Sequence, residues 1–438
     1  MDKTTKPAWC KAGKMDCLFR FLPLILAVAL WVVLSTYESA LLFRVNELSV
    51  FLFDGQYFTD MMSAPAGMLH YVSSFFVQFF YYPALGAAIY VLMLYAVYAL
   101  AVKVFSLQGS YRMLALLPVV AIVASNAQLG YWIFYLKQPG YYYMALLSTL
   151  LLLLALLVYR RMNEPLRMAV VVLWCVAGYP LAGAWALVGA VVMGCYSVAS
   201  AVGDKRSPVM PAVTLLLAVA AAVAVPHIYY RYYTTVCTEY MYGAGLPMTQ
   251  WVHYYVKKVE HEESSYWHNV YLYWIPYIVL LLSVAGLCVV LALRSRLSEG
   301  KWTRVVVGLP VMLFILLFLW VFWYNDNNFR IENKQNKAMW ERRWRDVSEY
   351  SRDAVEPTRQ IVMNKNAALF KQGTAMGEMF SYPDGSSDIL APMAVHLTQT
   401  GGKMLYFQYG KFNFSYRWCM EDAVEYGWRY EYLKHAAR

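Results

Sequence analysis

Charged residues are scarce in this chain, and the sequence motifs of several large enzyme classes are missing from it. Lys, Arg, Asp and Glu make up only 15 % of the 438 residues, whereas 60 % are hydrophobic. One soluble core cannot bury so much apolar surface, so the composition excludes an ordinary soluble globular domain. The chain also has no Walker loop, no GxSxG, no HExxH and no metal-type CxxC. Nucleotide-dependent, serine-hydrolase and zinc-protease chemistry therefore have no sequence signal here.

Lys and Arg are nearly absent from every second connecting segment between the apolar stretches. Five of them occur in that set of segments and sixteen in the alternate set. The five are Arg44, Lys137, Arg231, Lys257 and Lys258. The sixteen form clusters at Lys3 to Arg20, Lys103/Arg112, Arg160/Arg161/Arg167, Lys205/Arg206 and Arg294/Arg296/Lys301/Arg304. Short loops rich in Lys and Arg stay in the cytoplasm, so the N-terminus is predicted to lie inside. The net charge of +10 follows from these clusters and not from one basic face, so we expect no nucleic-acid partner.

Long apolar runs divide the chain into a membrane part and a C-terminal part. Each crossing of the hydrocarbon needs about 20 residues. Nine segments fit: Phe21–Leu42, Pro83–Val102, Met113–Ala127, Tyr142–Tyr159, Met168–Tyr179, Leu181–Val202, Pro211–Pro226, Val270–Leu293 and Val305–Tyr324. We predict an all-α fold with cytoplasmic residues 1–20, a polytopic bundle over 21–324, and an outer helical domain over 325–438. The two long outer loops are 43–82 and 227–269, and nine crossings place the C-terminus outside.

Two apolar runs fit more than one arrangement in the membrane. The run Met168–Val202 is too long for one crossing and is interrupted by Tyr179-Pro180 and Gly183. Arg167 and Lys205 flank it, and their charges favour the same side of the membrane, hence two passes. The first segment is longer than the apolar core of a cleavable signal peptide and continues into more apolar residues. We interpret it as an uncleaved anchor.

Aromatic residues are few on the cytoplasmic side and concentrated on the outer side. An interfacial belt alone would place Trp and Tyr at both faces of a bilayer. The outer groups include Tyr81-Tyr82, Tyr131 to Tyr135, Tyr141 to Tyr143 and Tyr229 to Tyr233. Two interpretations stay open: a thick belt with loop packing, or an outer groove whose rings stack on a sugar or a lipid head group.

The first outer loop contains three carboxylates among apolar residues. They are Glu47, Asp54 and Asp60, and each is either a candidate catalytic group or a solvated loop charge. Further along, Met68 to Phe80 has the pattern of an amphipathic helix lying in the membrane interface. Its polar members are His70, Ser73, Ser74 and Gln78.

The second outer loop and two cysteines have weaker patterns. The loop combines imidazole and carboxylate groups that a divalent cation could use, in a spacing that fits no ligand motif: His253, His261-Glu262-Glu263 and His268. Cys237 and Cys419 are the cysteines expected outside, where a disulfide could form. Neither pattern identifies a cofactor or a metal.

Residues 325–438 have frequent charges and the three- and four-residue steps of helices. Two stretches look alike, Asn366 to Gly373 and Met404 to Gly410. In each, a helix is expected to end at the glycine and a second helix to begin soon after. The residues expected to face the second helix are Leu369, Phe370, Tyr406 and Phe407. The glycines are 37 positions apart, close to the tetratricopeptide (TPR) period of about 34 residues. A TPR-like domain and a plain helical domain both fit. The uncapped apolar face of Tyr430 to Arg438 suggests an array that continues in a longer chain.

Several of these stretches resemble a family of polytopic membrane proteins of unknown function from Bacteroidota. The resemblance runs from the first predicted span to the last residue, and the stretches that carry it are Pro65 to Leu69, Gln78 to Gly86, Asn366 to Gly373 and Gly410 to Tyr416. It implies an inner-membrane protein of a Gram-negative cell, with the helical domain in the periplasm. It implies no activity.

A looser architectural similarity points to glycosyltransferases of the C superfamily, which use lipid-linked sugars and have an acidic catalytic residue in the first outer loop. The similarity implies that Glu47, Asp54 or Asp60 is a general base or holds a metal against a phosphate leaving group. Their paired acidic motif is missing here. The competing hypothesis is a membrane scaffold that presents helical repeats to a periplasmic protein. A transporter ranks third, because Glu38 is the only charge within the predicted spans.

Overall fold

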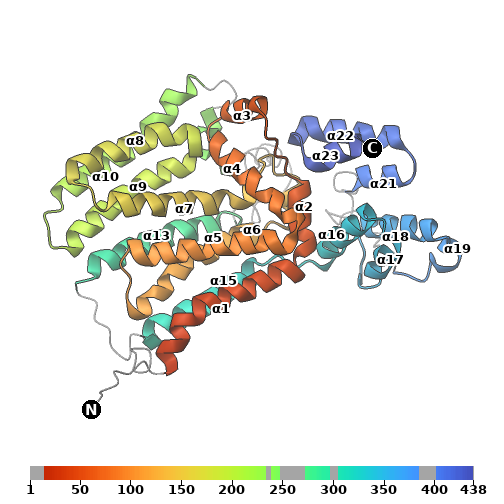
Figure 1. Ribbon diagram of the computed structural model, residues 1–438, viewed down its shortest axis with the longest axis horizontal. Coiled ribbons are helices and arrows are strands. Elements are labelled where there is room, and N and C mark those ends of the chain that lie inside the picture. The colour runs from red at the N-terminus through yellow and green to blue at the C-terminus, as the bar shows by residue number, and fades with distance from the viewer. Residues whose placement is uncertain (1–13, 233–237, 247–271, 296–303, 384–400, 438) are drawn as a thin grey trace, which may run out of the picture.

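The protein is helical wherever its structure is described. The computed structural model describes residues 14–232, 238–246, 272–295, 304–383 and 401–437, and each regular element in these ranges is a helix. Long apolar helices run side by side along the longest axis of the molecule, and shorter helices form a second part beyond one end of them (Figure 1). The predicted all-α class is confirmed for these residues.

Seven helices in these ranges are long and apolar enough to cross a membrane, by length and composition. They are α5 (Pro83–Val104), η3 (Gly109–Ala115) with α6 (Leu116–Ala127), α7 (Tyr141–Tyr159), α8 (Glu164–Ala182), α9 (Ala184–Gly203), α10 (Val209–Tyr230) and α13 (Ile275–Leu293). Each coincides with a predicted crossing. A set of apolar helices of this kind is consistent with a multi-pass membrane protein.

Two more predicted crossings are bent helix pairs. The first pair is α1 (Lys14–Thr36) and α2 (Ser39–Glu47), which meet at 69°. The second is η6 (Arg304–Gly308) continuing into α15 (Leu309–Phe322), which meets α16 (Asn327–Trp340) at 68°. The apolar run Phe21–Leu42 is therefore not one continuous helix. Leu42 is fully buried on α2, which packs against α16, so its apolar character serves the junction between the two parts.

Gly183 separates α8 from α9. Its φ is 59°, and a Cβ at this position would lie 2.2 Å from the carbonyl oxygen of Ala244. The backbone N–H of Ala184 donates to the same oxygen at 2.8 Å. Only glycine fits both the positive φ and this close approach. The prediction of two helices in this apolar run is confirmed.

Residues 43–82, which the sequence predicts to be the first outer loop, are mostly helical. They contain the end of α2, then α3 (Gly55–Met62), α4 (Gly67–Val77) and η2 (Gln78–Tyr81). A Cβ on Gly140 would lie 2.5 Å from the backbone nitrogen of Ser74, so this glycine allows α4 to approach α7 closely. Ser73 and Ser74 are buried there. The predicted helix exists, but the expected polar face was wrong at these serines, because they pack toward the bundle.

The second part consists of short helices that follow α16. They are α17 (Trp344–Ser351), α18 (Arg359–Gln372), α19 (Ala375–Glu378), α21 (Gly402–Gln408), α22 (Phe412–Tyr426) and α23 (Tyr430–Ala436). We call α16 to α23 the C-terminal domain. Neighbouring helices of this domain pack on each other, except that α21 packs on α18 rather than on α19, and both α16 and α23 contact α2. The two short helices η4 (Gly130–Phe134) and η5 (Thr238–Gly243) belong to the connections of the bundle.

Both predicted turn glycines end a helix with positive φ, 78° at Gly373 and 74° at Gly410. Across the second turn the Tyr406 ring stacks on Phe414 with centroids 5.7 Å apart, so α21 and α22 form the expected hairpin. The first turn differs because α19 is only four residues long. Phe370 is 71 % exposed, so the expectation that it faces a second helix was wrong.

Candidate functional site

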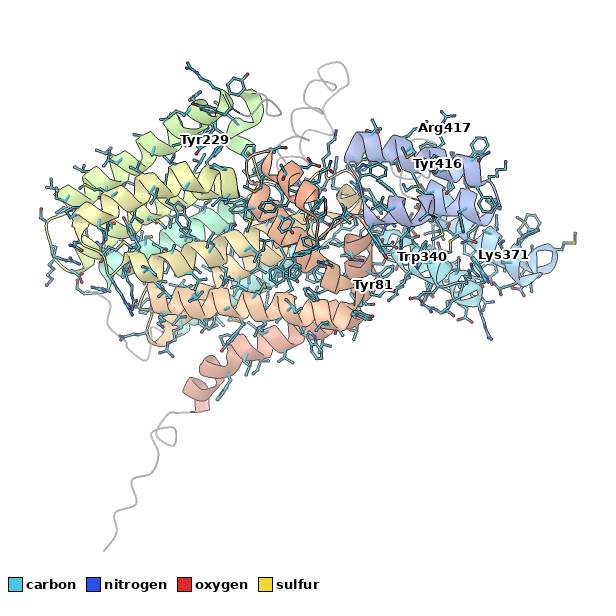
Figure 2. The ribbon with its side chains drawn as sticks, turned by 45° about the horizontal axis from the view of Figure 1, so that its top comes forward. Tyr81, Tyr229, Trp340, Lys371, Tyr416 and Arg417 are labelled. Atoms are coloured by element: carbon cyan, nitrogen blue, oxygen red, sulfur yellow. The ribbon has the colours of Figure 1, made fainter. Side chains whose placement is uncertain are left out.

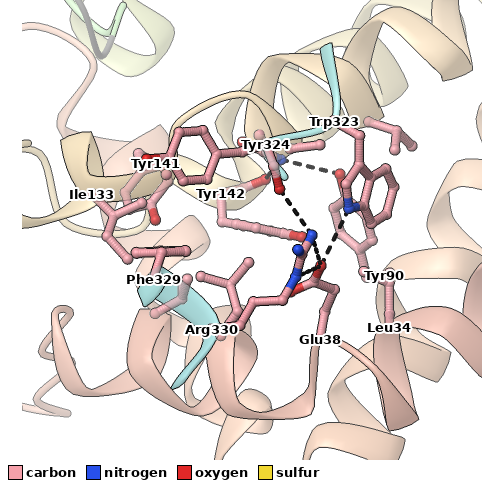
Figure 3. A pocket seen from close by; sticks show the side chains of 16 residues that line it. Leu34, Glu38, Tyr90, Ile133, Tyr141, Tyr142, Trp323, Tyr324, Phe329 and Arg330 are labelled. Carbon is pink, nitrogen blue, oxygen red and sulfur yellow. Dashed lines mark hydrogen bonds and ion pairs between the residues drawn. The ribbon is translucent and has the colours of Figure 1, made fainter. Parts of the chain in front are cut away.

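A buried ion pair joins the two bends. Glu38 lies between α1 and α2, and its Oε1 accepts hydrogen bonds from Arg330 Nε and Nη2, both at 3.3 Å, and from Trp323 Nε1 at 3.2 Å (Figure 3). The Arg330 guanidinium also lies 4.7 Å from the centre of the Tyr37 ring. These contacts surround a cavity of only about 30 Å³, which is room for about one water molecule. The pair fixes α16 against the α1–α2 bend and leaves no space for a larger ligand.

A second buried ion network holds α23 against α2. Arg44 Nη1 lies 2.8 Å from Glu431 Oε1 and 3.1 Å from Glu47 Oε2. Glu47 Oε1 pairs with Lys434, and its Oε2 accepts a hydrogen bond from Asn336 Nδ2 at 3.4 Å. All five residues have little exposed surface, so the four charged side chains attract one another more strongly than they would in water.

The network continues into the C-terminal domain and back to the bundle. Lys403 is buried and pairs with Asp422. Arg429 donates to the carbonyl oxygens of Phe134 at 2.9 Å and Leu136 at 2.8 Å, where the chain leaves η4. Charged side chains thus fasten the C-terminal domain at several points to the connections at one end of the bundle. Replacing a single member would leave a buried charge without its partner.

Burial and opposite charges set the pKa values in this network. Burial alone raises the pKa of Glu431, but the charges of Arg44 and Lys403 outweigh it and lower that pKa to about 2. Burial lowers the pKa of His435 to about 4 against the attraction of Glu431. At neutral pH Glu431 is therefore ionised and His435 is neutral.

Glu332 on α16 is in a different situation. Its carboxylate accepts hydrogen bonds from the hydroxyls of Thr358 at 2.5 Å and Tyr131 at 2.9 Å. Burial nevertheless raises its pKa to about 7, because these two bonds offset only part of the desolvation. Tyr131 belongs to the bundle and Thr358 to the C-terminal domain, so Glu332 is a titratable group at the junction.

Next to this network the surface is hollowed by a groove of about 660 Å³. We call it the junction groove. Its walls come from α2 and the residues after it, the end of α4 with η2, and α23. Its lining residues are Asn46, Ser49, Val50, Phe51, Leu52, Ser74, Val77, Gln78, Tyr81, Tyr82, Tyr430, Leu433, Lys434 and Ala437. Figure 2 shows Tyr81 at the end of the bundle that faces the C-terminal domain.

Lys434 is the charged residue in the groove wall. Its Nζ lies 3.5 Å from the centre of the Trp340 ring and 5.1 Å from that of Tyr430, besides pairing with Glu47. The face of an aromatic ring attracts a cation through the ring quadrupole. The sequence alone does not identify Lys434 as a candidate. Tyr430 and Lys434 lie four positions apart on a short helix, and this spacing indicates a site only when α2 is known to lie beside that helix.

The structure does not bring the three predicted carboxylates together. Glu47 is buried behind Lys434, and both of its oxygens have partners. Asp54 is exposed and caps α3, where its Oδ2 accepts hydrogen bonds from the backbone N–H groups of Gln56 at 3.0 Å and Tyr57 at 3.2 Å. Asp60 is exposed on α3. A general base needs an accessible lone pair, and Glu47 is held as a structural ion.

The other candidate sites have little support within the described ranges. No group of three or more His, Cys, Asp or Glu side chains that could hold a metal ion occurs among the described residues. The histidines of the second outer loop, His253, His261 and His268, lie outside those residues, as does Cys237. Cys419 is buried within the C-terminal domain.

The bundle consists of apolar helices that could cross a membrane, and a buried ion network joins it to a helical domain at one end. These features are consistent with a multi-pass membrane protein that has a helical domain. Residues 14–437 match the model of a family of unknown function, DUF6057, and the chain belongs to that family. No curated protein and no solved structure matches the chain.

Proposed function

We propose that the protein crosses the inner membrane of a Gram-negative cell nine times, with its N-terminus in the cytoplasm and the C-terminal domain in the periplasm. The sixteen-to-five distribution of Lys and Arg supports this orientation. The long apolar arms of the two bent pairs, α1 and α15, supply the first and the ninth crossings in addition to the seven unbent helices. Both bends lie at the end of the bundle that carries the C-terminal domain, opposite the end where α1 begins (Figure 1).

In this orientation the junction groove is at the outer leaflet, and its function is to bind the polar part of a membrane-anchored amphiphile. The observation that carries this proposal is the groove itself, about 660 Å³ in volume, with tyrosines 81, 82 and 430 in its walls. Tyrosine has an apolar ring and a polar hydroxyl, which suits a ligand that is part sugar or head group and part hydrocarbon. A lipid-linked sugar is the first candidate.

Binding is better supported than glycosyl transfer. Both carboxylate oxygens of Glu47 are held by partners, Oε2 by Arg44 and Oε1 by Lys434, so neither is placed to take a proton from a bound ligand. If transfer follows binding, Asp54 is the carboxylate to test first, since it is exposed and lies two residues beyond Leu52 in the groove wall. An Asp54→Asn protein that binds a lipid-linked sugar but no longer consumes it would assign that role.

The groove itself is tested by filling it. Gln78 is exposed in the groove wall, so Gln78→Trp adds bulk to the groove without changing the core. Gln108→Trp is the matched control, because Gln108 is exposed at the start of η3, far from the groove along the chain. Native mass spectrometry with a short-chain polyprenyl-phosphate hexose should show binding to the parent and to Gln108→Trp and weak binding to Gln78→Trp. Equal binding by all three would refute the proposal.

A scaffold for a periplasmic protein is the second candidate, and a separate observation favours it. Phe370, Met376 and Phe380 are 71 %, 103 % and 85 % exposed around α19, the part of the C-terminal domain farthest from the bundle (Figure 1). Exposed apolar patches often mark interaction sites. A photo-crosslinking residue at Phe380 should label one defined envelope protein, whereas the same residue at exposed Arg417 on α22 should not. Identical labelling patterns at the two sites would remove the argument for this candidate.

A further inference from the structure

We infer that the ligand of the junction groove is a lipid whose head group carries a net negative phosphate charge. The inference rests on the proposed function and adds the chemistry of recognition. The charges around the groove support this assignment, since the shape of the groove alone does not distinguish one head group from another.

The side chains at the junction between α2 and the C-terminal domain include more cations than carboxylates. The cations are Arg44, Lys337, Lys403, Arg429 and Lys434, and the carboxylates are Glu47, Asp422 and Glu431. The neighbouring Glu38–Arg330 pair is neutral as a whole, and the buried imidazole of His435 is uncharged at neutral pH. Glu332 lies at the same junction and adds at most one negative charge at neutral pH. At least one positive charge is therefore in excess, and a concave site with an excess of one sign concentrates ligands of the opposite sign.

Lys337 and Arg429 are the two cations that have no carboxylate within ion-pair distance among the described residues. Arg429 is instead solvated by the carbonyl oxygens of Phe134 and Leu136. The Lys337 ammonium instead lies over the Phe43 ring, with its Nζ 5.3 Å from the ring centre. A ring face compensates an ammonium charge less well than a carboxylate does. Lys337 is the cation left most open to an added anion.

Phe43 connects these cations to the groove. Lys434 Nζ also lies over its ring, 5.7 Å from the centre, so lysines from α16 and α23 converge on one side chain of α2. The Phe43 ring in turn contacts Tyr81 in the groove wall, with centroids 5.9 Å apart. Lys434 lines the groove itself, whereas Lys337 is not a lining residue and would attract a phosphate seated beside Tyr81 from the other contact of the Phe43 ring. The hydrocarbon chain of the lipid would leave toward the bilayer along η2 and the start of α5.

The experiment compares two lipids with the same chains, phosphatidylglycerol (net negative) and phosphatidylcholine (zwitterionic). Each is added to the delipidated full-length protein, and native mass spectrometry measures the dissociation constant. We expect the parent to prefer phosphatidylglycerol and Lys337→Gln to lose about fivefold in affinity for it, with phosphatidylcholine unchanged; one lysine near an anionic surface contributes about that factor. Lys337 is only partly buried, so the variant should fold and melt like the parent.

Lys371→Gln is the matched control, because Lys371 is an exposed lysine of the same domain, remote from the groove (Figure 2). It should bind both lipids as the parent does. Equal affinity of the parent for the two lipids would overturn the charge inference, while a loss of both lipids in Gln78→Trp would still support the groove. Unchanged binding of both lipids in Gln78→Trp would overturn the groove proposal and this inference together. Displacement of phosphatidylglycerol by millimolar glycerol phosphate would overturn the lipid assignment in favour of a soluble phosphate ester.

Discussion

Arg44 and Glu431 are 387 positions apart in the sequence, yet their side chains form a buried ion pair with 2.8 Å between Nη1 and Oε1. This pair joins the helix that follows the first apolar segment to the last helix of the C-terminal domain. It makes the C-terminal domain and the end of the bundle next to it one structural unit at the place where the junction groove lies.

Breaking this pair should loosen the C-terminal domain. Arg44→Met leaves the Glu431 carboxylate buried without its main partner, which costs about 3–5 kcal/mol in the free energy of unfolding. Thermal unfolding in detergent and limited proteolysis of residues 325–438 would measure it. The control is Arg345→Met, because Arg345 pairs with Glu349 on the surface and is 85 % exposed. That change should cost less than about 1 kcal/mol. Equal melting temperatures for the two variants would show that the Arg44–Glu431 pair does not hold the domain.

The same pair should make the junction acid-sensitive. The pKa of Glu431 is lowered from 4.5 to about 2 in the folded protein, so its ionised form contributes stability above pH 4.5. That contribution is lost as the pH falls from about 4.5 toward 2. The difference in stability between the parent and Glu431→Gln should accordingly shrink over this range. A difference that stays constant from pH 6 to pH 3 would contradict the lowered pKa.

Glu332 should have the opposite effect. Its pKa is raised from 4.5 to about 7, so the folded protein holds a proton that the unfolded chain releases, and stability falls as the pH rises from 4.5 to 7. Glu332→Gln keeps an acceptor for Tyr131 and Thr358 and removes the charge. The variant should be more stable than the parent by up to about 3 kcal/mol at pH 8 and equal to it below pH 4.5. Glu349→Gln, a change at an exposed carboxylate, should show no such trend.

Gly410→Val should destabilise the α21–α22 hairpin. The φ of Gly410 is 74°, and a β-branched residue in this region costs roughly 1–2 kcal/mol. Gly377→Val is the matched control, since Gly377 also has open space around its Cβ position but does not have a positive φ. Circular dichroism during thermal unfolding should show a lower midpoint for Gly410→Val than for Gly377→Val. The reverse order would mean that φ is not what this turn requires.

The topology is tested by fusing alkaline phosphatase, which is active only outside the cytoplasm, after Tyr324 and after Arg206. The fusion after Tyr324 should be active, because that position follows the ninth proposed crossing. The fusion after Arg206 should be inactive, because Lys205 and Arg206 belong to a cytoplasmic cluster. Activity at both points, or at neither, would overturn the count of crossings.

Local patterns in the sequence predicted much of the helical framework. The apolar runs from Pro83 to Leu293 coincide with seven helices, because hydropathy over about 20 residues is a property of each segment alone. Gly183, Gly373 and Gly410 marked helix ends for a similarly local reason, the positive φ that each adopts. The same reasoning failed at Ser73 and Ser74. A pattern of polar residues indicates a face, and it does not indicate whether another helix covers that face.

The sequence by itself therefore determined the helical class, the apolar segments and the bias of charge between connecting segments, since each depends on residues that are close along the chain. The tertiary structure alone decided where the charges of Arg44, Glu47 and Lys434 go and that a groove lies beside them. An ion pair between residues 387 positions apart produces no periodic sequence pattern in either of the two segments that form it. Glu47 looked like a loop carboxylate for this reason, and only the packing of α23 against α2 makes it a buried structural ion.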